Sequence, residues 1–280
     1  GFVLGGRSVG PWLTAFAYGT SYFSAVVFIG YAGQFGWKYG MSTTWIGIGN
    51  AIIGSLIAWL VLAKPTRRMT NKLNSTTMPD FFGKRYDSEA LKIAASGIVF
   101  IFLIPYTASV YNGLSRLFKM AFDIPFWVCI VVMAVLTGVY VILGGYMATA
   151  VNDFIQGIIM LVGIVIVILA VLNGKGGFAA AVDSLSKVSD VDIPAGSLTS
   201  LFGPDPLNLL GVVILTSLGT WGLPQMVHKF YTIKDDKAIK TGTIISTIFA
   251  TIIAGGSYFL GGFGRLFEPA MENGKIAFDS

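Results

Sequence analysis

Long apolar stretches dominate the chain, and shorter polar or charged connections separate them. A helix needs about 20 apolar residues to cross the hydrocarbon core of a bilayer. The stretches do not alternate apolar and polar residues with the period of two that is typical of membrane barrel strands. The pattern therefore predicts seven membrane-spanning helices, at about residues 9–35, 42–63, 92–118, 125–145, 152–172, 207–228 and 241–264.

The connections between these helices differ in the sign of their charge. The connection 64–92 carries seven basic residues against three acidic ones, and 229–240 carries four against two, whereas 173–206 carries two against four. If the helices alternate in direction, both basic connections lie on one side of the membrane. Lysine and arginine are enriched in cytoplasmic connections, so we expect the N-terminus of this chain to be cytoplasmic.

Two of the predicted helices contain residues that weaken a helix near its middle. The stretch 19–24 holds a glycine and three hydroxyl residues, and the stretch 217–225 holds two glycines and a proline, which alone costs about 3 kcal/mol in a helix interior. Unwound backbone is tolerated in a bilayer only where it lines a cavity or is buried in protein. Paired interruptions mark the binding sites of many secondary transporters. The alternative for 19–24 is close helix packing against small residues.

The composition supports a membrane protein and excludes other classes. Of the 280 residues, 54% are hydrophobic and 12% are charged, and the mean hydropathy is +0.74, whereas a soluble domain carries about 25% charged residues. The net charge of +5 comes from basic residues near helix ends. The sequence has one cysteine and one histidine, and none of the common catalytic or cofactor motifs. We expect an all-α integral membrane protein that is not an enzyme, needs no cofactor and binds no nucleic acid.

Three sequence motifs on separate connections resemble those of the sodium:solute symporter family. They are Gly-Gly-Arg-Ser-Val-Gly-Pro at 5–11, Thr-x-Pro-Asp-Phe with a following Arg-Tyr at 77–86, and Leu-Gly-Gly-Tyr-Met-Ala with a following Asn-Asp-x-x-Gln at 143–156. The resemblance covers essentially the whole chain, and Tyr146 is a mild departure from the Leu, Met or Phe that is usual there. The family includes proline, pantothenate, sialic acid and sugar symporters. The stretch from Thr20 onward is most similar to the pantothenate-type branch, because the proline-type branch carries an acid at the position of Tyr22.

The resemblance implies a LeuT-type fold, in which five helices and five more are related by a pseudo-twofold axis in the membrane plane. The chain would be a single transmembrane domain, 1–280, with residues 9–172 as the first repeat and 207–264 as the start of the second. The family has a further helix before Gly5 and several after Ser280. About seven of the family's helices are represented, so we expect a fragment of a longer protein.

The resemblance also implies where the ion and the solute bind. The family binds sodium through backbone carbonyls of its first broken helix, at the positions of Thr20 and Phe23, and some members use the aspartate that matches Asp153. Carbonyl oxygens of unwound backbone suit a hard cation, because they supply oxygen ligands without placing a full negative charge inside the membrane. Asp153 has the alternative of a helix cap, and Trp221 has that of a core aromatic. The positions that match solute contacts are Tyr22, Ser24, Val27, Thr44, Ser217, Thr220, Trp221 and Gln225.

The function implied is sodium-coupled symport of a small organic solute, a carboxylate, a vitamin or an amino acid, by alternating access in the plasma membrane. The partners would be the solute, Na⁺ as the coupling ion and the lipid bilayer. The sugar branch has an acid and a lysine that this chain lacks, and Tyr22 makes proline a poorer guess. One alternative is the transmembrane sensor module of a larger signalling protein. Another is a channel, but the chain shows isolated polar breaks rather than a continuous polar stripe.

Overall fold

The computed structural model describes residues 2–23, 26–191, 193–267, 271–272 and 275–276. Helices make up nearly all of its regular structure, and among the described residues only β1 (Met271–Glu272) and β2 (Lys275–Ile276) form a strand pair. The predicted all-α class is confirmed. The α-helices are α1 (Pro11–Tyr22), α2 (Ala32–Tyr39), α3 (Thr44–Gly49), α4 (Lys64–Lys72), α5 (Met78–Tyr86), α6 (Glu89–Phe122), α7 (Phe126–Gly174), α8 (Phe178–Ser186), α9 (Pro206–Leu218), α10 (Pro224–Thr232) and α11 (Asp236–Gly261).

The helices that are long and apolar enough to cross a membrane are fewer than the seven predicted stretches. In the described part of the chain four qualify, Ala32–Lys72, α6, α7 and α11, and the bent pair α9 and α10 makes a fifth. Two features account for the difference. Gly145 leaves helical geometry inside the 49-residue α7 (φ 58°, ψ −153°), so α7 holds two of the predicted stretches. A break after Tyr22 leaves α1 only 12 residues long.

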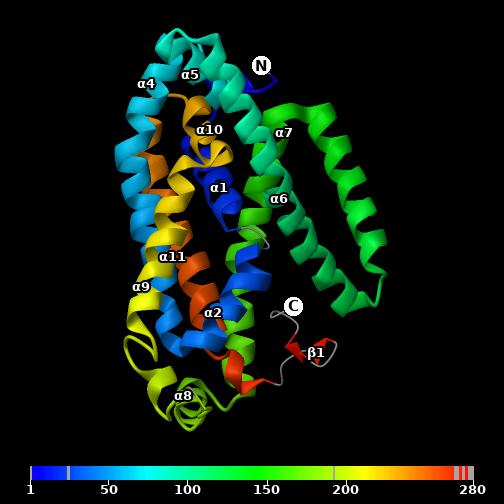
Figure 1. Cartoon of the computed structure of the whole chain (residues 1–280), viewed down its shortest axis with the longest axis vertical. Coiled ribbons are helices and arrows are strands. Elements are labelled where there is room, and N and C mark those ends of the chain that lie inside the picture. Colours follow the sequence, from blue (N-terminus) through cyan, green and yellow to red (C-terminus); the bar gives the residue numbers. More distant parts are fainter. Residues whose placement is uncertain (1, 24–25, 192, 268–270, 273–274, 277–280) are drawn as a thin grey trace.

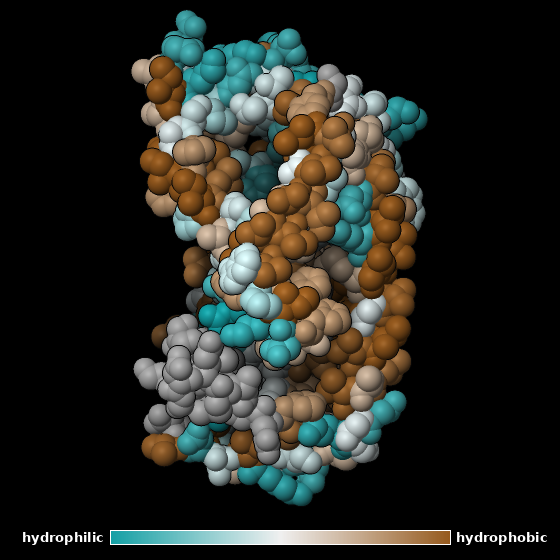
Figure 2. All heavy atoms as spheres, turned by 90° about the vertical axis from the view of Figure 1, so that its right-hand side faces the viewer, coloured by the Kyte–Doolittle hydropathy of each residue, from teal (hydrophilic) through white to brown (hydrophobic). Residues whose placement is uncertain are grey.

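The chain runs back and forth between two polar ends. Figure 1 shows α4, α5 and α10 at one end and α8 at the other. Arg67 and Arg68 of the first basic connection pair with Asp236 of the second, at 3.3 and 2.6 Å, so both basic connections lie at the same end. In Figure 2 hydrophilic residues gather at the two ends and hydrophobic residues cover most of the surface between them. This is the surface pattern of a protein that spans a bilayer.

The segments that carry the three sequence motifs come together around α10, at the end that holds α5. The N–H of Tyr146 donates a hydrogen bond to the carbonyl of Phe2 (2.9 Å). The guanidinium of Arg7 donates to three backbone carbonyls, those of Thr70 (3.3 Å) and Ser75 (2.6 Å) around the end of α4 and that of Tyr231 (3.3 Å) in α10. Charge-assisted hydrogen bonds are roughly twice as strong as neutral ones. Arg7 therefore ties the start of the chain to the connector before α5 and to α10.

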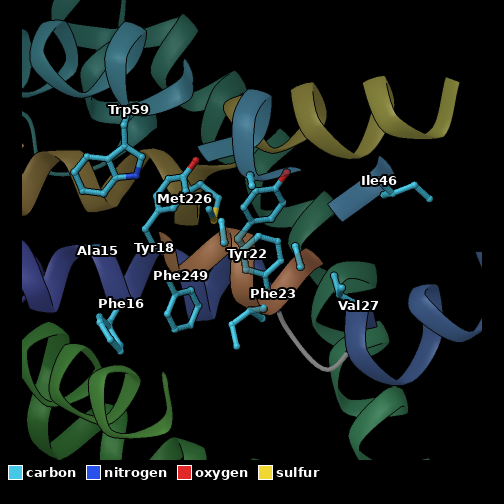
Figure 3. Packing of buried hydrophobic residues seen from close by; sticks show 14 of the residues in the cluster. Ala15, Phe16, Tyr18, Tyr22, Phe23, Val27, Ile46, Trp59, Met226 and Phe249 are labelled. Carbon is cyan, nitrogen blue, oxygen red and sulfur yellow. The ribbon is translucent and has the colours of Figure 1, made fainter. Parts of the chain in front are cut away.

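Aromatic side chains fill the core around α1. Tyr18 lies 5.6 Å from Trp59 and 5.6 Å from Phe230 between ring centroids, and Trp59 lies 5.2 Å from Phe230. On another side of α1, Phe16 contacts Phe249 of α11 at 5.1 Å, and Figure 3 shows these two rings next to each other. Large aromatic side chains bury much apolar surface, so this cluster fixes α1 against α10 and α11.

The helices α2 and α11 approach so closely that their backbones touch at glycines. A Cβ on Gly36 would lie 1.8 Å from the carbonyl oxygen of Gly261, and a Cβ on Gly261 would lie 2.0 Å from the carbonyl oxygen of Ala32. Small residues permit such close approach of two helices in a membrane protein. The contact holds α2, which follows the break at the end of α1, against α11.

We expect Gly36→Ala to lower the free energy of unfolding by about 1–3 kcal/mol, because the added methyl group has no room against α11. A lower melting temperature of the purified protein in detergent would report this. Gly33→Ala is the matched control on the same helix, since nothing lies within 4 Å of a Cβ added there. Equal melting temperatures for the two variants would contradict the close contact.

Candidate functional site

The first helix interruption lies at the end of α1. The helix ends at Tyr22, and Phe23 takes non-helical backbone angles (φ −98°, ψ 68°). The interruption predicted for 19–24 is present, but the helix continues through the first half of that stretch. The ring of Phe249 lies so close to Gly19 that a Cβ there would be 2.3 Å from it. Packing against α11 therefore outweighs the low helix propensity of these residues.

The second interruption separates α9 from α10. After Leu218 a 3₁₀ segment, Gly219–Gly222, leads to Leu223, which is extended (φ −70°, ψ 124°) before α10 begins at Pro224. Proline disfavours helical geometry in the residue before it and fits the first turn of the helix that follows. The two helices meet at an angle of 51°. The interruption predicted for 217–225 is present, and the local sequence explains it.

Hydroxyl groups connect the two interruptions. The Tyr22 hydroxyl donates a hydrogen bond to the backbone carbonyl of Thr216 on α9 (2.9 Å). The side chains of Ser217 and Thr220 lie near the same hydroxyl. The Thr220 hydroxyl donates to the Ser217 carbonyl (2.9 Å). Three of the predicted solute-binding residues, Tyr22, Ser217 and Thr220, are therefore brought together.

Asn50 completes this polar cluster, and the sequence analysis missed it. Its side-chain oxygen accepts hydrogen bonds from the hydroxyls of Thr216 (3.0 Å) and Ser217 (3.1 Å). Asn50 is only 1% exposed and begins the π-helical segment Asn50–Ile57. It is the only amide residue in the apolar stretch 42–63. An amide side chain inside a predicted span is itself a signal of function or of a buried partner.

Trp221 lies within the second interruption, and Gln225 lies just after it in the first turn of α10. The indole N–H of Trp221 donates to the carbonyl of Ile53 (3.0 Å), which fixes the ring against the helix that carries Asn50. The side-chain amide of Gln225 is buried, and neither its nitrogen nor its oxygen has a hydrogen-bond partner in the described part of the chain. Buried polar groups are nearly always paired. Gln225 therefore offers both a donor and an acceptor to a further molecule.

The remaining predicted solute-binding residues differ in their placement. Val27 is buried in the hydrophobic cluster that contains Tyr22. Thr44 begins α3, and its hydroxyl donates to the Met41 carbonyl (2.8 Å). The nearest member of the cluster on the same helical stretch is Asn50, six residues further along, roughly 9 Å at the rise of a helix. Thr44 is therefore not part of the cluster, and Ser24 lies outside the described residues.

The predicted sodium-binding residues come from α1 and α7. The Asp153 carboxylate lies near the Thr20 side chain, whose hydroxyl donates to the carbonyl of Phe16 on its own helix (2.9 Å). Phe23 is buried, and its ring stacks on that of Tyr22 at 4.3 Å (Figure 3). The alternative reading of Asp153 as a helix cap is wrong, because α7 continues through it from Gly145 to Gly174. Asp153 is a carboxylate in a helix interior, beside the first interruption.

Lys229 of α10 faces Asp153, and the sequence analysis did not connect the two. Its ammonium nitrogen lies 3.7 Å from the Asp153 carboxylate, and the lysine and aspartate side chains are 10% and 22% exposed. The same nitrogen lies 5.3 Å from the centre of the Tyr146 ring. The charge count had assigned Lys229 to a connection, but α10 extends to Thr232. Lys229 therefore lies inside a helix rather than in a loop.

We expect Asn50→Ala to lower the free energy of unfolding by about 1–3 kcal/mol, because it leaves the buried Ser217 hydroxyl without its acceptor. Thermal denaturation in detergent measures the change. Asn71→Ala, at an exposed position of α4, is the matched control and should leave the melting temperature unaltered. A wild-type melting temperature for Asn50→Ala would show that the amide does not hold the hydroxyl cluster together.

Comparison with known proteins agrees with this architecture. The model of the sodium:solute symporter family matches residues 2–274. A sodium/proline symporter of Staphylococcus aureus is 32% identical over 278 residues, which cover 96% of this chain and 52% of the relative. The sodium/proline symporter of S. aureus strain JH9 is also 32% identical, over 96% of this chain and 51% of its own length.

The chain spans about half the length of these curated relatives. The family description and the names of the relatives denote transporters rather than enzymes. The match runs across both helix interruptions and all three motifs. The chain belongs to the sodium:solute symporter family.

Proposed function

We propose that the protein couples the transport of a small organic solute to sodium entry, by alternating access in the plasma membrane. The observation that carries the proposal is the meeting of two interrupted helices at Tyr22, whose hydroxyl reaches Thr216, Ser217 and Thr220. Unwound segments at such meetings form the ion and solute sites of many transporters. Membership of the sodium:solute symporter family supports sodium as the coupling ion.

Sodium would bind at the end of α1. A helix carries a partial negative charge at its C-terminal end, where the last carbonyls lack helical partners. The carbonyls of Thr20 and Phe23 belong to this end, next to the angles that interrupt the helix. Asp153 adds a carboxylate beside Thr20. A hard cation favours oxygen ligands of these two kinds, backbone carbonyls and a carboxylate.

The solute would bind at the start of α10. The N-terminal end of a helix carries a partial positive charge and free N–H groups, which favour a carboxylate. The unpartnered amide of Gln225 lies in the first turn of α10. We therefore propose that the solute carries a carboxylate, which includes amino acids and acidic vitamins. The hydroxyl cluster, Val27 and Trp221 would surround the rest of the solute, and Ser24 and Thr44 stay predictions.

The mechanism uses two inverted repeats and the energy that sodium gains on entry. We propose a LeuT-type fold in which residues 9–172 form one repeat and residues 207–264 begin the other, with the N-terminus cytoplasmic. One positive charge that moves inward through 100 mV gains about 2.3 kcal/mol, roughly a fifty-fold concentration ratio for the solute. The helices would rock about a site that stays near mid-membrane.

The direct test uses the protein as its host encodes it, reconstituted in liposomes. We expect an inward sodium gradient to drive accumulation of a labelled carboxylate, and proline is the first compound to assay because the relatives are named for it. Pantothenate and a short monocarboxylate follow. Replacement of external sodium by choline should abolish the accumulation. Uptake that is the same with and without a sodium gradient would refute sodium coupling.

A single substitution tests the solute site. We expect Gln225→Leu to raise the half-saturating solute concentration at least about tenfold, since a hydrogen bond to a charged group contributes about 1.5–3 kcal/mol. The melting temperature should not fall, because the amide has no partner within the described protein. Gln156→Leu, at an exposed position of α7, is the control. An unchanged half-saturation in Gln225→Leu would remove this residue from the site.

A further inference from the structure

Asp153 and Lys229 form an ion pair inside the helical part of the molecule. Their charged atoms are 3.7 Å apart, and both side chains are largely buried. Asp153 belongs to α7 and Lys229 to α10, two helices within the apolar candidate spans. Charged side chains in such positions are costly and are kept where they pair or perform a task. Removal of either residue would leave the charge of the other buried without a partner, which is strongly destabilising.

The surroundings of the pair come from three helices. The Thr20 side chain of α1 lies beside the carboxylate. The Tyr146 ring of α7 lies 5.3 Å from the ammonium nitrogen, within reach of a cation–π interaction. The carboxylate thus borders the place where α1 is interrupted, and the ammonium has a second partner on its other side. The ammonium can leave the carboxylate without losing every favourable contact.

We propose that Lys229 is a built-in competitor of sodium for the Asp153 carboxylate. The inference rests on the function proposed above, because it requires that sodium enters beside α1. A sodium ion and an ammonium group carry the same charge and use the same carboxylate oxygens. The ion reaches Asp153 when the ammonium moves toward Tyr146, and the ion pair re-forms when the ion leaves.

The exchange links the ion to the solute through α10. Lys229 follows Gln225 by four residues on this helix, so the two side chains lie on one face. The ion pair fastens that face to α7. Sodium at Asp153 releases α10 from α7 and leaves the helix that carries Gln225 free to adjust around the solute. Lys229 thereby acts as a positioning residue for the solute site.

Sodium binding to the purified, full-length encoded protein tests the competition directly. We expect Lys229→Met to bind ²²Na⁺ about tenfold more tightly in equilibrium dialysis without solute, if the ion pair is closed about nine-tenths of the time. Lys229→Arg keeps a competing charge and should stay near the wild type. The double variant Asp153→Asn with Lys229→Met should lose the gain. Lys237→Met, at an exposed position of α11, should have no effect.

A second measurement needs no variant and so does not depend on folding. Sodium should increase the reaction of Lys229 with an amine-labelling reagent, measured by mass spectrometry against Lys237. Labelling of Lys229 that does not respond to sodium, or a Lys229→Met variant that folds and binds sodium as the wild type does, would overturn the competition. A wild-type protein that binds no sodium would instead refute the proposed function itself.

Discussion

The structure depends on the need of every backbone polar group in a bilayer to find a partner. A continuous helix meets this need within itself, but an interrupted one does not. The two interruptions, after Tyr22 and at Gly219–Leu223, therefore turn inward and share one set of hydroxyl groups. Asn50 extends that set by accepting from Thr216 and Ser217. The buried helix ends carry unpaired backbone groups, and these groups are what the proposed ion and solute sites use.

The apolar pattern could predict the helices, because a span needs a length of apolar residues that few other structures use. It could also predict the second interruption, since Pro224 acts on its own neighbours whatever surrounds them. The first interruption was harder to locate. Its position depends on how Phe249 packs against Gly19, a contact between residues more than two hundred positions apart. Local sequence carries no record of such a contact.

The polar partners were the least predictable part of the site. The roles of Asn50 and Lys229 depend on partners that are distant in sequence. Asn50 accepts a hydrogen bond from Ser217, and Lys229 forms an ion pair with Asp153. The charge pattern places Lys229 in a basic connection, whereas in the structure α10 continues past it to Thr232. Thr44 matches a solute-contacting position of the family, yet its hydroxyl bonds to the Met41 carbonyl and lies apart from the hydroxyl cluster, so its role stays a prediction. A resemblance to a family indicates which position along the chain matches a functional residue, but it does not show which side chains that residue contacts.

The hydrogen bonds of Arg7 have a mechanical consequence. One planar cation near the start of the chain binds the carbonyls of Thr70 and Ser75, which are close in sequence, and that of the distant Tyr231, and loss of this cation would leave three acceptors unpaired at once. The opposite end of the molecule, around α8, has a link of the same kind, because Arg265 donates to the carbonyl of Trp37 (2.8 Å) and to the carboxylate of Asp190 (3.2 Å). An arginine therefore fastens separate segments at each end of the molecule, so a rearrangement of the helices that keeps both links intact has to take place between the two ends.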